Sequence, residues 1–480
     1  MLFSSPIFLF LFLPLVLGVY FLAPRPWKNA ILLLASLFFY AWGEKFYVLV
    51  MVGSILGNYL LGLGIEASKQ RRAGRVLLAL AVVLNLALLI SCKYANFLAD
   101  NLNVVLTSFD VPSVRLKPVH LPIGISFFTF EALAYLIDIR RGQTTAARNP
   151  INFGLFMTFF PHLIAGPVVR YRDLATAIES RSASRAQVAS GIRRFILGLA
   201  KKMLLANTFA QTAEALFRLP PAELAASAAW LGLLCYTLQI YFDFSGYSDM
   251  AIGLGRLFGF ELNENFAYPY TARSVTEFWR RWHMSLSSWF RDYLYVPLGG
   301  NRHGAGRTYL NLMLVFMFCG LWHGASWNFL AWGMFHGLFL VLERLGGGKL
   351  LGILPRSLQH GLTLVVMMVG WVFFEAKSLA HAGGFLSAMI GLQHGEYVWH
   401  DYWGQELALA MIVGLVACCP VWPSIQDRWQ RLQGQVKVRW RPALAALGEM
   451  VSLVGLSCLF LASMLQLAAG TNNPFIYYRF

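Results

Sequence analysis

Two histidines, His323 and His336, interrupt the apolar stretch GLWHGASWNFLAWGMFHG at residues 320–337. An imidazole has an ordinary pKa of about 6.5, so it can take a proton from a reacting group and return it. A neutral imidazole is also less costly in apolar surroundings than a charged side chain. These two residues are therefore the first candidates for acid–base catalysis.

The spacing of the two histidines separates their roles. In one continuous helix, thirteen residues at about 1.5 Å each would place them about 20 Å apart, too far to act on the same bond. His323 follows the apolar run YLNLMLVFMFCGLW (309–322) and precedes Gly-Ala-Ser, which predicts a helix end that can face a cavity. His336 lies within the next helix. We predict that His323 is catalytic and that His336 is structural, with its ring satisfied by a neighbouring helix.

The segment TEFWRRWHMSLSSWFRDYLYVPLGGNR (276–302) supplies a third histidine and three arginines. At about 100° per residue, one helix face carries apolar side chains and the other polar ones. The apolar face holds Phe278, Trp282, Leu286, Trp289 and Tyr293, and the polar face holds Thr276, Arg280, His283, Ser287 and Arg291. The pattern predicts one amphipathic helix, ended by a chain reversal at PLGGNR (297–302). Either the helix lies among lipid headgroups, or it dips into the protein and directs His283 and the arginines at an anionic substrate.

Acidic side chains fall within a second polar segment, LQIYFDFSGYSDMAIGLGRLFGF (238–260). It contains Asp243, Ser245, Ser248 and Asp249 in a glycine-rich stretch that is long enough to span a membrane. One interpretation is that the small residues pack helices together while the acids pair with nearby arginines. The other is that Asp243 and Asp249 border a water-filled cavity or hold a catalytic group in place.

The elements that position these residues are membrane helices. The 480 residues are 58% hydrophobic and only 13% charged, far from the balance of soluble globular domains. Stretches long enough to cross a hydrocarbon core of about 30 Å recur along the whole chain. They are 7–23, 30–63, 76–92, 119–139, 151–169, 194–210, 227–258, 309–343, 359–376, 406–422 and 445–469. The stretch 30–63 has room for two helices, and 309–343 is expected to form two. We predict an all-α polytopic protein of eleven to thirteen membrane-embedded helices, forming one domain over 1–480 with a motif-rich core at about 119–343.

The charge and the cysteines narrow the possible functions. The net charge of +16 sits mainly in short connections such as 68–75, 139–142 and 427–441, which predicts cytoplasmic loops rather than a nucleic-acid-binding domain. The six cysteines fall within or beside apolar spans without metal-ligand spacing. We interpret them as buried small hydrophobic residues and predict no metal site.

Five motifs give a resemblance to a known family. They are FFTFEALAYLIDIRRG (127–142), FFPHLIAGPVVRY (159–171), YFDFSGYSDMAIGLG (241–255), EFWRRWHMSLSSWFRDYLYVPLGGNR (277–302) and GLWHGASWNFLAWGMFHG (320–337). In this order they resemble the bacterial alginate O-acetyltransferase branch of the membrane-bound O-acyltransferase family. The similarity extends from MLFSSPIFLFLFLP at the start of the chain to NPFIYYRF at its end.

The resemblance implies a fold, a donor substrate and site residues. The fold is a set of membrane helices around a central tunnel. The family's essential histidine falls on His323 and its earlier partner histidine on His283. The donor is acetyl-CoA, with no tightly bound cofactor. As a hypothesis, the CoA phosphates lie near Arg280, Arg281 and Arg291, since guanidinium groups suit bidentate contacts with phosphate.

Two positions depart from the family pattern. Glu131 stands where related sequences often carry Gln, and Glu375, in WVFFEAKSL, stands where Arg is common. Neither position is one of the two histidines. Glu375 nevertheless removes the basis for carrying over a family ion pair at that point.

The expected function is transfer of acetyl groups from cytoplasmic acetyl-CoA across the bacterial inner membrane for O-acetylation of an exopolysaccharide. His323 would act as general base, or alternatively as acetyl acceptor. No GxSxG serine motif occurs in the chain, so a periplasmic serine acetyltransferase partner is expected to complete the transfer. Two other classes stay open: a transporter that uses the histidines as proton carriers, and a structural subunit of a polysaccharide secretion complex.

Overall fold

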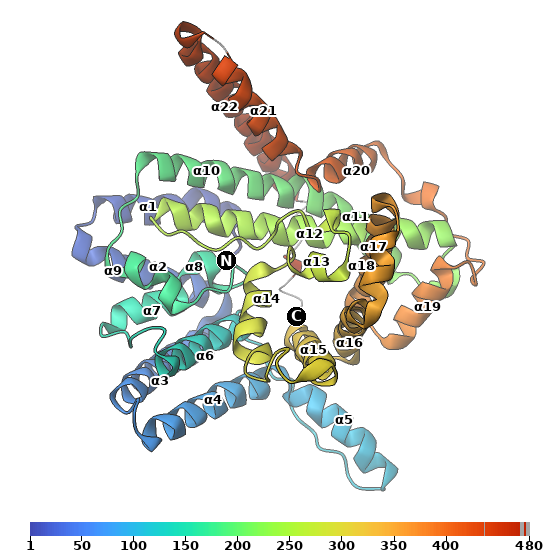
Figure 1. Ribbon diagram of the computed structural model, residues 1–480, viewed down its shortest axis with the longest axis horizontal. Helices are drawn as coiled ribbons and strands as arrows, with labels where there is room; N and C mark the ends of the chain where they lie inside the picture. Colours follow the sequence, from blue (N-terminus) through green and yellow to red (C-terminus); the bar gives the residue numbers. More distant parts are fainter. Residues whose placement is uncertain (436, 471–474, 477–480) are drawn as a thin grey trace. The chain divides into compact units, whose positions relative to one another are not determined.

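Helices account for all the regular structure of the described chain (Figure 1). The structure is a computed structural model and describes residues 1–435, 437–470, 475 and 476. Within these residues no β-strand is formed, and β-type pairing is limited to two isolated bridges, Leu224 with Tyr397 and Phe266 with Trp282. The predicted all-α class is confirmed. Val436 in the basic 427–441 connection, and most of the terminal NPFIYYRF motif, lie outside the described residues.

The chain forms two units, each assembled from segments that are far apart in the sequence. Unit 1 contains Met1–Gly191, Ala251–Asn263 and Leu321–Ser326. Unit 2 contains Ile192–Met250, Glu264–Gly320 and the described residues from Trp327 onward. His323 therefore belongs to unit 1, while His283 and His336 belong to unit 2. The single domain over 1–480 stays a prediction.

Unit 1 is built around helices α3, α4 and α6, which pack against one another. Its helices are α1 (Leu13–Leu22), α2 (Lys28–Glu44), α3 (Val48–Ala67), α4 (Arg72–Lys93), α5 (Ala95–Ser108), α6 (Ile125–Arg141), α7 (Pro150–Thr158), α8 (Phe160–Leu163) and α9 (Tyr171–Glu179). Nearly every residue of α6 is buried, so this helix forms the centre of the unit. Gly124 and Gly142 flank it in the left-handed conformation, which glycine adopts without steric cost.

Unit 2 holds the remaining helices. They are α10 (Arg185–Ala200), α11 (Asn207–Arg218), α12 (Ala226–Leu257), α13 (Val275–Trp279), α14 (Met284–Phe290), α15 (Gly304–His323), α16 (Trp327–Leu342), α17 (Gly348–Ile353), α18 (Arg356–Glu375), α19 (Leu379–Met389), α20 (Gln405–Ala417), α21 (Val421–Gln435) and α22 (Arg441–Ala468). The first residues of α10, the last turns of α12 and the last three residues of α15 belong to unit 1.

A close approach of α10 and α12 explains the glycines of the second polar segment. A Cβ atom at Gly246 would lie 2.8 Å from the carbonyl oxygen of Gly198, and one at Gly198 would lie 2.5 Å from that of Gly246. Any larger side chain at either position would force the helices apart. This geometry supports the prediction that small residues in 238–260 pack helices together.

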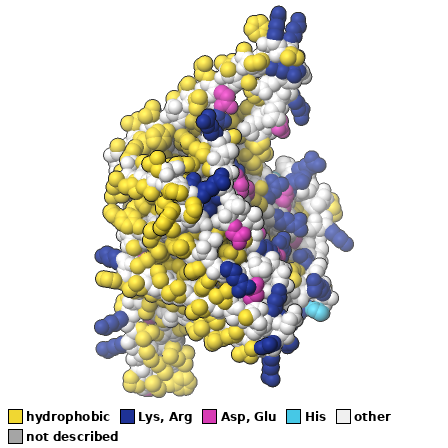
Figure 2. Space-filling view, turned by 90° about the vertical axis from the view of Figure 1, so that its left-hand side faces the viewer, with side chains coloured by type: hydrophobic (Ala, Val, Ile, Leu, Met, Phe, Trp, Pro, Cys, Tyr) yellow, Lys and Arg dark blue, Asp and Glu magenta, His cyan; other side chains and the backbone are white. Residues whose placement is uncertain are grey.

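Several helices are long and apolar enough to cross a membrane. Six segments pass this test among the described residues, or seven if the bent pair α20 and α21 forms one span. Large apolar side chains are exposed on them, including Leu34, Leu49 and Leu453, and hydrophobic side chains cover broad areas of the face in Figure 2. Such a surface is typical of contact with lipid. The chain is therefore a multi-pass membrane protein, as predicted.

The expected count of eleven to thirteen membrane-embedded helices includes shorter and broken segments. The predicted span 309–343 forms two helices, α15 and α16, as expected. The predicted span 151–169 is not one helix: it forms α7 and α8 with a non-helical residue, Phe159, between them, and then a turn at Ile164 and Ala165. Pro167 disfavours helical backbone at Gly166, which keeps the helix from resuming after the turn.

The cysteines are free thiols in two different settings. Cys235, Cys319 and Cys418 are buried, and Cys92 is partly buried, as expected for small hydrophobic residues. Cys419 and Cys458 are exposed, so for these two the prediction of burial is wrong. Cys458 lies on α22, whose most apolar window has no buried residue.

Candidate active site

His323 is the last residue of α15, and the helix break predicted after it is present. Gly324, Ala325 and Ser326 are non-helical, and α16 begins at Trp327. His323 is 5% exposed. The catalytic position predicted from the sequence is thus a buried imidazole at a helix terminus. His336 lies in the body of α16, also as predicted.

The end of α15 is held by the end of α4. The last carbonyl groups of a helix have no partner within the helix and favour a positive charge beside them. Here the Tyr94 hydroxyl donates to the carbonyl of Leu321 at 2.6 Å, and the Lys93 ammonium donates to those of Trp322 and His323 at 2.5 and 3.2 Å. The last turn of α15 is therefore fixed through its backbone by Lys93 at the end of α4 and by Tyr94, the residue that follows it.

Aromatic packing fixes the same turn from a second side. The Trp322 ring lies 5.4 Å from that of Phe127 and 5.7 Å from that of Phe130, both on α6. The Lys93 ammonium also lies 5.9 Å from the Trp322 ring centroid, within the range of a cation–π contact. The His323 imidazole lies edge-on to Trp322, with ring centroids 4.9 Å apart.

Glu131, the first departure from the family pattern, has a histidine partner. Its Oε1 atom lies 3.1 Å from Nδ1 of His162 and accepts a hydrogen bond from the backbone of Val169 at 3.3 Å. Both side chains are at most 1% exposed. A buried carboxylate is stable only with such partners, so the glutamate is accommodated by His162. His162 lies in a quoted motif, but the sequence analysis did not single it out.

The segment around His283 is not the continuous amphipathic helix that periodicity predicts. It forms two short helices, α13 and α14, and His283 lies between them with φ of 46° and ψ of 52°. The backbone of Arg281 accepts a hydrogen bond from Ala267, and that of Met284 donates to Asn265. Pairing with an extended chain segment thus replaces the helical hydrogen bonds at the break.

Because the helix is broken at His283, its side chain points into the interior of the protein. The predicted apolar face is confirmed, because Phe278, Trp282, Leu286, Trp289 and Tyr293 are all buried. His283, predicted on the polar face, is also buried, at 1% exposed. Its Nδ1 atom lies 3.4 Å from Oδ1 of Asn265, and its ring meets Phe244 edge-on at 4.6 Å. Burial lowers the pKa of His283 to about 3, so the imidazole is neutral near pH 7.

The three arginines remain nearer the surface. Arg281 binds Glu277 at 2.6 Å and the Thr271 hydroxyl at 2.9 Å. Arg291 is exposed and binds the neighbouring Asp292 at 2.7 Å. Arg280 is exposed and, among the described residues, forms no ion pair. The structure therefore does not bring the arginines together with His283. Their contact with CoA phosphates stays a prediction.

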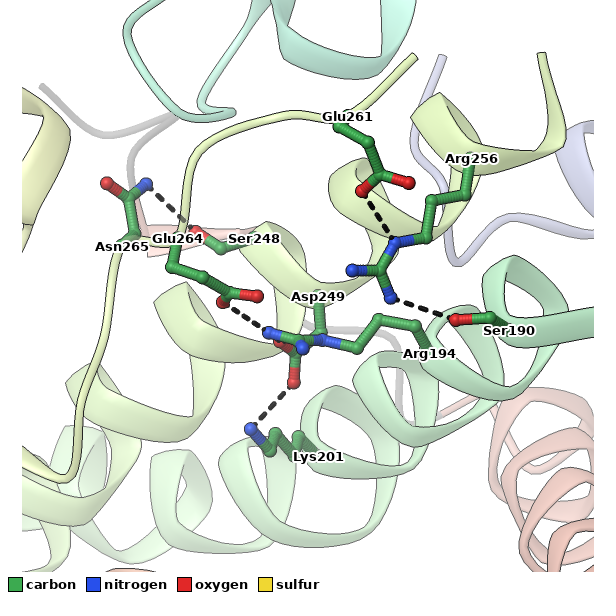
Figure 3. Close-up of polar contacts among 9 residues, drawn as sticks. All are labelled: Ser190, Arg194, Lys201, Ser248, Asp249, Arg256, Glu261, Glu264 and Asn265. Carbon is green, nitrogen blue, oxygen red and sulfur yellow. Dashed lines mark hydrogen bonds and ion pairs between the residues drawn. The ribbon is translucent and has the colours of Figure 1, made fainter. Parts of the chain in front are cut away.

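The acids of the second polar segment are paired, as the first interpretation holds. Asp249 binds Arg194 and Lys201, each at 2.7 Å, and Arg194 also binds Glu264 at 2.6 Å (Figure 3). Asp243 forms a separate, buried pair with Lys202 at 2.5 Å. Its other oxygen accepts a hydrogen bond from the backbone of Ile476 at 2.7 Å.

A second group in Figure 3 belongs to unit 1. Arg256 binds Glu261 at 3.0 Å and donates to the Ser190 hydroxyl at 3.0 Å. These ion pairs offset opposite charges and leave no unpaired carboxylate in either group. Asp243 and Asp249, the acids of 238–260, are likewise paired, as the first interpretation predicts.

His336 is packed among aromatic rings and, in the part of the chain that the structure describes, lacks the polar partner that was predicted. It is fully buried among the rings of Trp279, Trp332 and Phe335, at centroid distances of 5.0 to 5.2 Å. Within the described residues, neither ring nitrogen has a hydrogen-bond partner, so the predicted satisfied partner is wrong. Aromatic rings fill the positions where a polar partner would lie. A Cβ at Gly370 on α18 would lie 2.5 Å from its Nε2 atom, so glycine is required for this contact.

The predicted reversal at PLGGNR is present. Residues 296–303 form turns, with Gly299 and Gly300 at positive φ. The side chain of Asn311 donates to the carbonyls of Leu298 and Gly300 at 3.3 and 2.9 Å. These contacts anchor the turn on α15, the helix that ends at His323.

Comparison with known proteins defines the class to which this arrangement belongs. The profile of the membrane-bound O-acyltransferase family matches residues 127–346, which include His283 and His323. Similarity to individual members extends over the full length, as described next, so the chain belongs to the membrane-bound O-acyltransferase family. It is an acyltransferase, as predicted.

Three relatives show which members of the family the chain is similar to. It is 41% identical to the probable alginate O-acetylase AlgI of Pseudomonas putida and 41% identical to that of Azotobacter vinelandii, with all of each chain covered. It is 37% identical to the peptidoglycan O-acetyltransferase of Helicobacter pylori, over 82% of this chain and 80% of that protein. The predicted branch of the family is confirmed.

Proposed function

We propose that this protein transfers acetyl groups from acetyl-CoA toward the hydroxyl groups of an exported polysaccharide, of the alginate or cellulose kind. The observation that carries the proposal is the buried imidazole of His323 at a helix end held by Lys93 and Tyr94. Full-length similarity to alginate O-acetylases supports the acyl group and the acceptor class.

The proposed chemistry is attack of a hydroxyl on a thioester. His323 takes the proton of the incoming hydroxyl as its oxygen bonds to the acetyl carbonyl carbon. The carbon–sulfur bond then breaks, and the imidazolium returns the proton to the CoA thiolate. The products are an acetyl ester and CoA. In the alternative, the imidazole itself carries the acetyl group between donor and acceptor.

His283 contributes a second neutral imidazole to this proposal. Its lowered pKa keeps the ring neutral near pH 7, so one nitrogen can accept a proton or a hydrogen bond from a reacting group, and burial makes it a weaker base than a free imidazole. Arg280, Arg281 and Arg291 are the proposed contacts of the CoA phosphates. Arg280 is the strongest of the three candidates, because Arg281 and Arg291 already bind carboxylates.

The proposed setting is the bacterial inner membrane, with acetyl-CoA supplied from the cytoplasm. A periplasmic serine-type acetyltransferase and the polysaccharide are the proposed partners. A path through the protein would spare the cell a free acetyl intermediate outside the cytoplasm. The several apolar helices of the chain fit this multi-pass setting.

The test uses inverted membrane vesicles that contain the full-length protein and its partner, supplied with acetyl-labelled CoA. We expect the protein to release CoA thiol and to place the label in base-labile esters of the polysaccharide. Transport of a solute without CoA release would instead support the transporter class. Wild-type vesicles that release no CoA while the polysaccharide is still acetylated would refute acetyl-CoA as the donor.

A further inference from the structure

Asn265 contacts His283 through both its backbone and its side chain. It lies between α12 and α13, in the extended segment that pairs with the break in 276–302, and it is 1% exposed. Its carbonyl oxygen accepts a hydrogen bond from the backbone of Met284 at 3.1 Å. Its side-chain oxygen lies 3.4 Å from Nδ1 of His283.

The hydrogen bonds of the Asn265 amide fix its orientation. Oδ1 accepts from the backbone N–H of Ser285 at 3.2 Å and from the Ser285 hydroxyl at 2.6 Å. A backbone N–H can only donate, so the atom facing it must be the amide oxygen. On the other side, the amide NH2 group donates to the Ser248 hydroxyl at 3.2 Å (Figure 3).

This orientation decides which nitrogen of His283 carries the proton. An amide oxygen can only accept, so a hydrogen bond to it requires a proton on Nδ1. In a neutral imidazole the other nitrogen then holds the lone pair. We propose that Asn265 is a positioning residue that holds His283 as the Nδ1–H tautomer and leaves Nε2 as the basic nitrogen for proton transfer. This inference deepens the proposed function, on which it rests for the role of His283 in acyl transfer.

The partner that sets the tautomer of His283 in this proposal, Asn265, is neutral. Phe244 on α12 packs edge-on against the imidazole and fixes its plane. The carboxylates on the same helix, Asp243 and Asp249, are paired with Lys202 and with Arg194 and Lys201. Burial is the cause of the lowered pKa of His283, so Asn265 acts by orienting the ring and not by changing its charge.

The direct test is the tautomer itself. Nitrogen-15 NMR of histidine-labelled protein in lipid nanodiscs separates Nδ1–H from Nε2–H imidazole, and His283→Gln identifies the signal. We expect the Nδ1–H form in the wild type and in Ser248→Ala, which retains all three contacts of Oδ1. We expect a mixture or the Nε2–H form in Asn265→Leu. An Nε2–H signal in the wild type would overturn the inference whether or not the protein turns over acetyl-CoA.

The kinetic test compares a variant that removes the hydrogen-bond acceptor for Nδ1 of His283, Asn265→Leu, with one that keeps an acceptor, Asn265→Asp. Asn265→Leu should lower kcat about tenfold to a hundredfold, within the range of lost base catalysis, with KM for acetyl-CoA little changed. Asn265→Asp keeps an acceptor for Nδ1–H but adds a charge, so it should raise the pKa of His283 by about 1 to 3 units. Its rate should approach that of the wild type at high pH and fall on the acid side, where His283 becomes protonated.

The controls separate orientation from packing. Ser248→Ala removes the other contact of the amide and should cost less than Asn265→Leu. Asn85→Ala removes a buried amide from the Asn58 pair on α3 and α4, and it reports the general cost of such a loss. Equal losses in Asn265→Leu, Ser248→Ala and Asn85→Ala, or an Asn265→Asp pH profile identical to the wild type, would overturn the inference. A wild type without acetyl-CoA turnover would refute only the proposed function.

Discussion

The two histidines proposed to act in acyl transfer are held in opposite ways. His323 is held through its backbone, because Lys93 and Tyr94 bind the carbonyl groups of the helix end on which it stands. His283 is held through its ring, by Asn265 and Phe244, at a break between two short helices. The contacts at His323 fix the position of its backbone. Those at His283 fix the orientation of the ring and, in our proposal, which ring nitrogen carries the proton.

The same side chain can thus be positioned for proton transfer either through its backbone or through its ring. A backbone anchor leaves the side chain replaceable without loss of the anchor, so a variant at His323 removes chemistry and little structure. A ring anchor makes the side chain part of the packing. Substitution at His283 therefore removes both a base and a partner of Asn265.

The largest effect is expected from His323→Ala. Loss of a general base costs about 10²- to 10⁴-fold in rate, so acetyl ester content of the polysaccharide should fall to background. Abundance in the membrane should stay near that of the wild type, because the hydrogen bonds of Lys93 and Tyr94 to this turn are to backbone carbonyls and not to the His323 side chain. The measurement is ester content per amount of membrane protein. A wild-type acetyl content would remove His323 from the mechanism.

His283→Ala should lower turnover less, by about tenfold to a hundredfold, because His323 remains. If both histidines serve one reaction, the double variant should be no slower than His323→Ala alone, since residues that act as a unit are not additive. The rates of the two single variants and the double variant decide this. Multiplied losses in the double variant would mean that the two residues act on independent steps.

Lys93→Met should lower kcat about tenfold through the backbone of His323, without removing any group of the histidine. Charged hydrogen bonds contribute about 1.5 to 3 kcal/mol, and the carbonyls of Trp322 and His323 would lose theirs. Lys93→Arg should retain part of the rate, while Lys349→Met, which changes an exposed lysine, should leave it unchanged. Full activity of Lys93→Met would show that aromatic packing of Trp322 suffices to hold the turn.

The smallest kinetic effect is expected from lysine substitutions at the arginines. Arg280→Lys should raise KM for acetyl-CoA about threefold to tenfold, because lysine keeps the charge but loses bidentate contacts. Arg281→Lys and Arg291→Lys should change it less, since Glu277 and Asp292 already hold those side chains. A donor concentration series gives the three values. Unchanged KM in all three would favour contact of these arginines with lipid headgroups.

The sequence predicted the parts of the fold that depend on local pattern. The run 309–322 and the following Gly-Ala-Ser were enough to place His323 at a helix end, because chain breaks of this kind are local. Lys93 offered a signal as well. It directly follows the apolar stretch 76–92. A charged side chain in a membrane segment usually pairs with another side chain or with backbone carbonyl groups.

The site around His283 could not be predicted in the same way. Its periodicity is that of an amphipathic helix, and only pairing with residues 265–267 breaks that helix and buries the imidazole. The partner Asn265 is one of two asparagines in ELNENF, with no local feature to distinguish it. His336 shows the same limit: its spacing placed it within a helix, but the aromatic rings around it come from two different helices.

Release of CoA thiol from acetyl-CoA by inverted vesicles, compared between the wild type and His323→Ala at equal protein abundance, shows whether His323 performs the transfer. We expect release by the wild type that depends on the polysaccharide and its partner, and release at the background level for His323→Ala. Equal release by both would contradict the claim that the imidazole at the capped end of α15 performs the transfer.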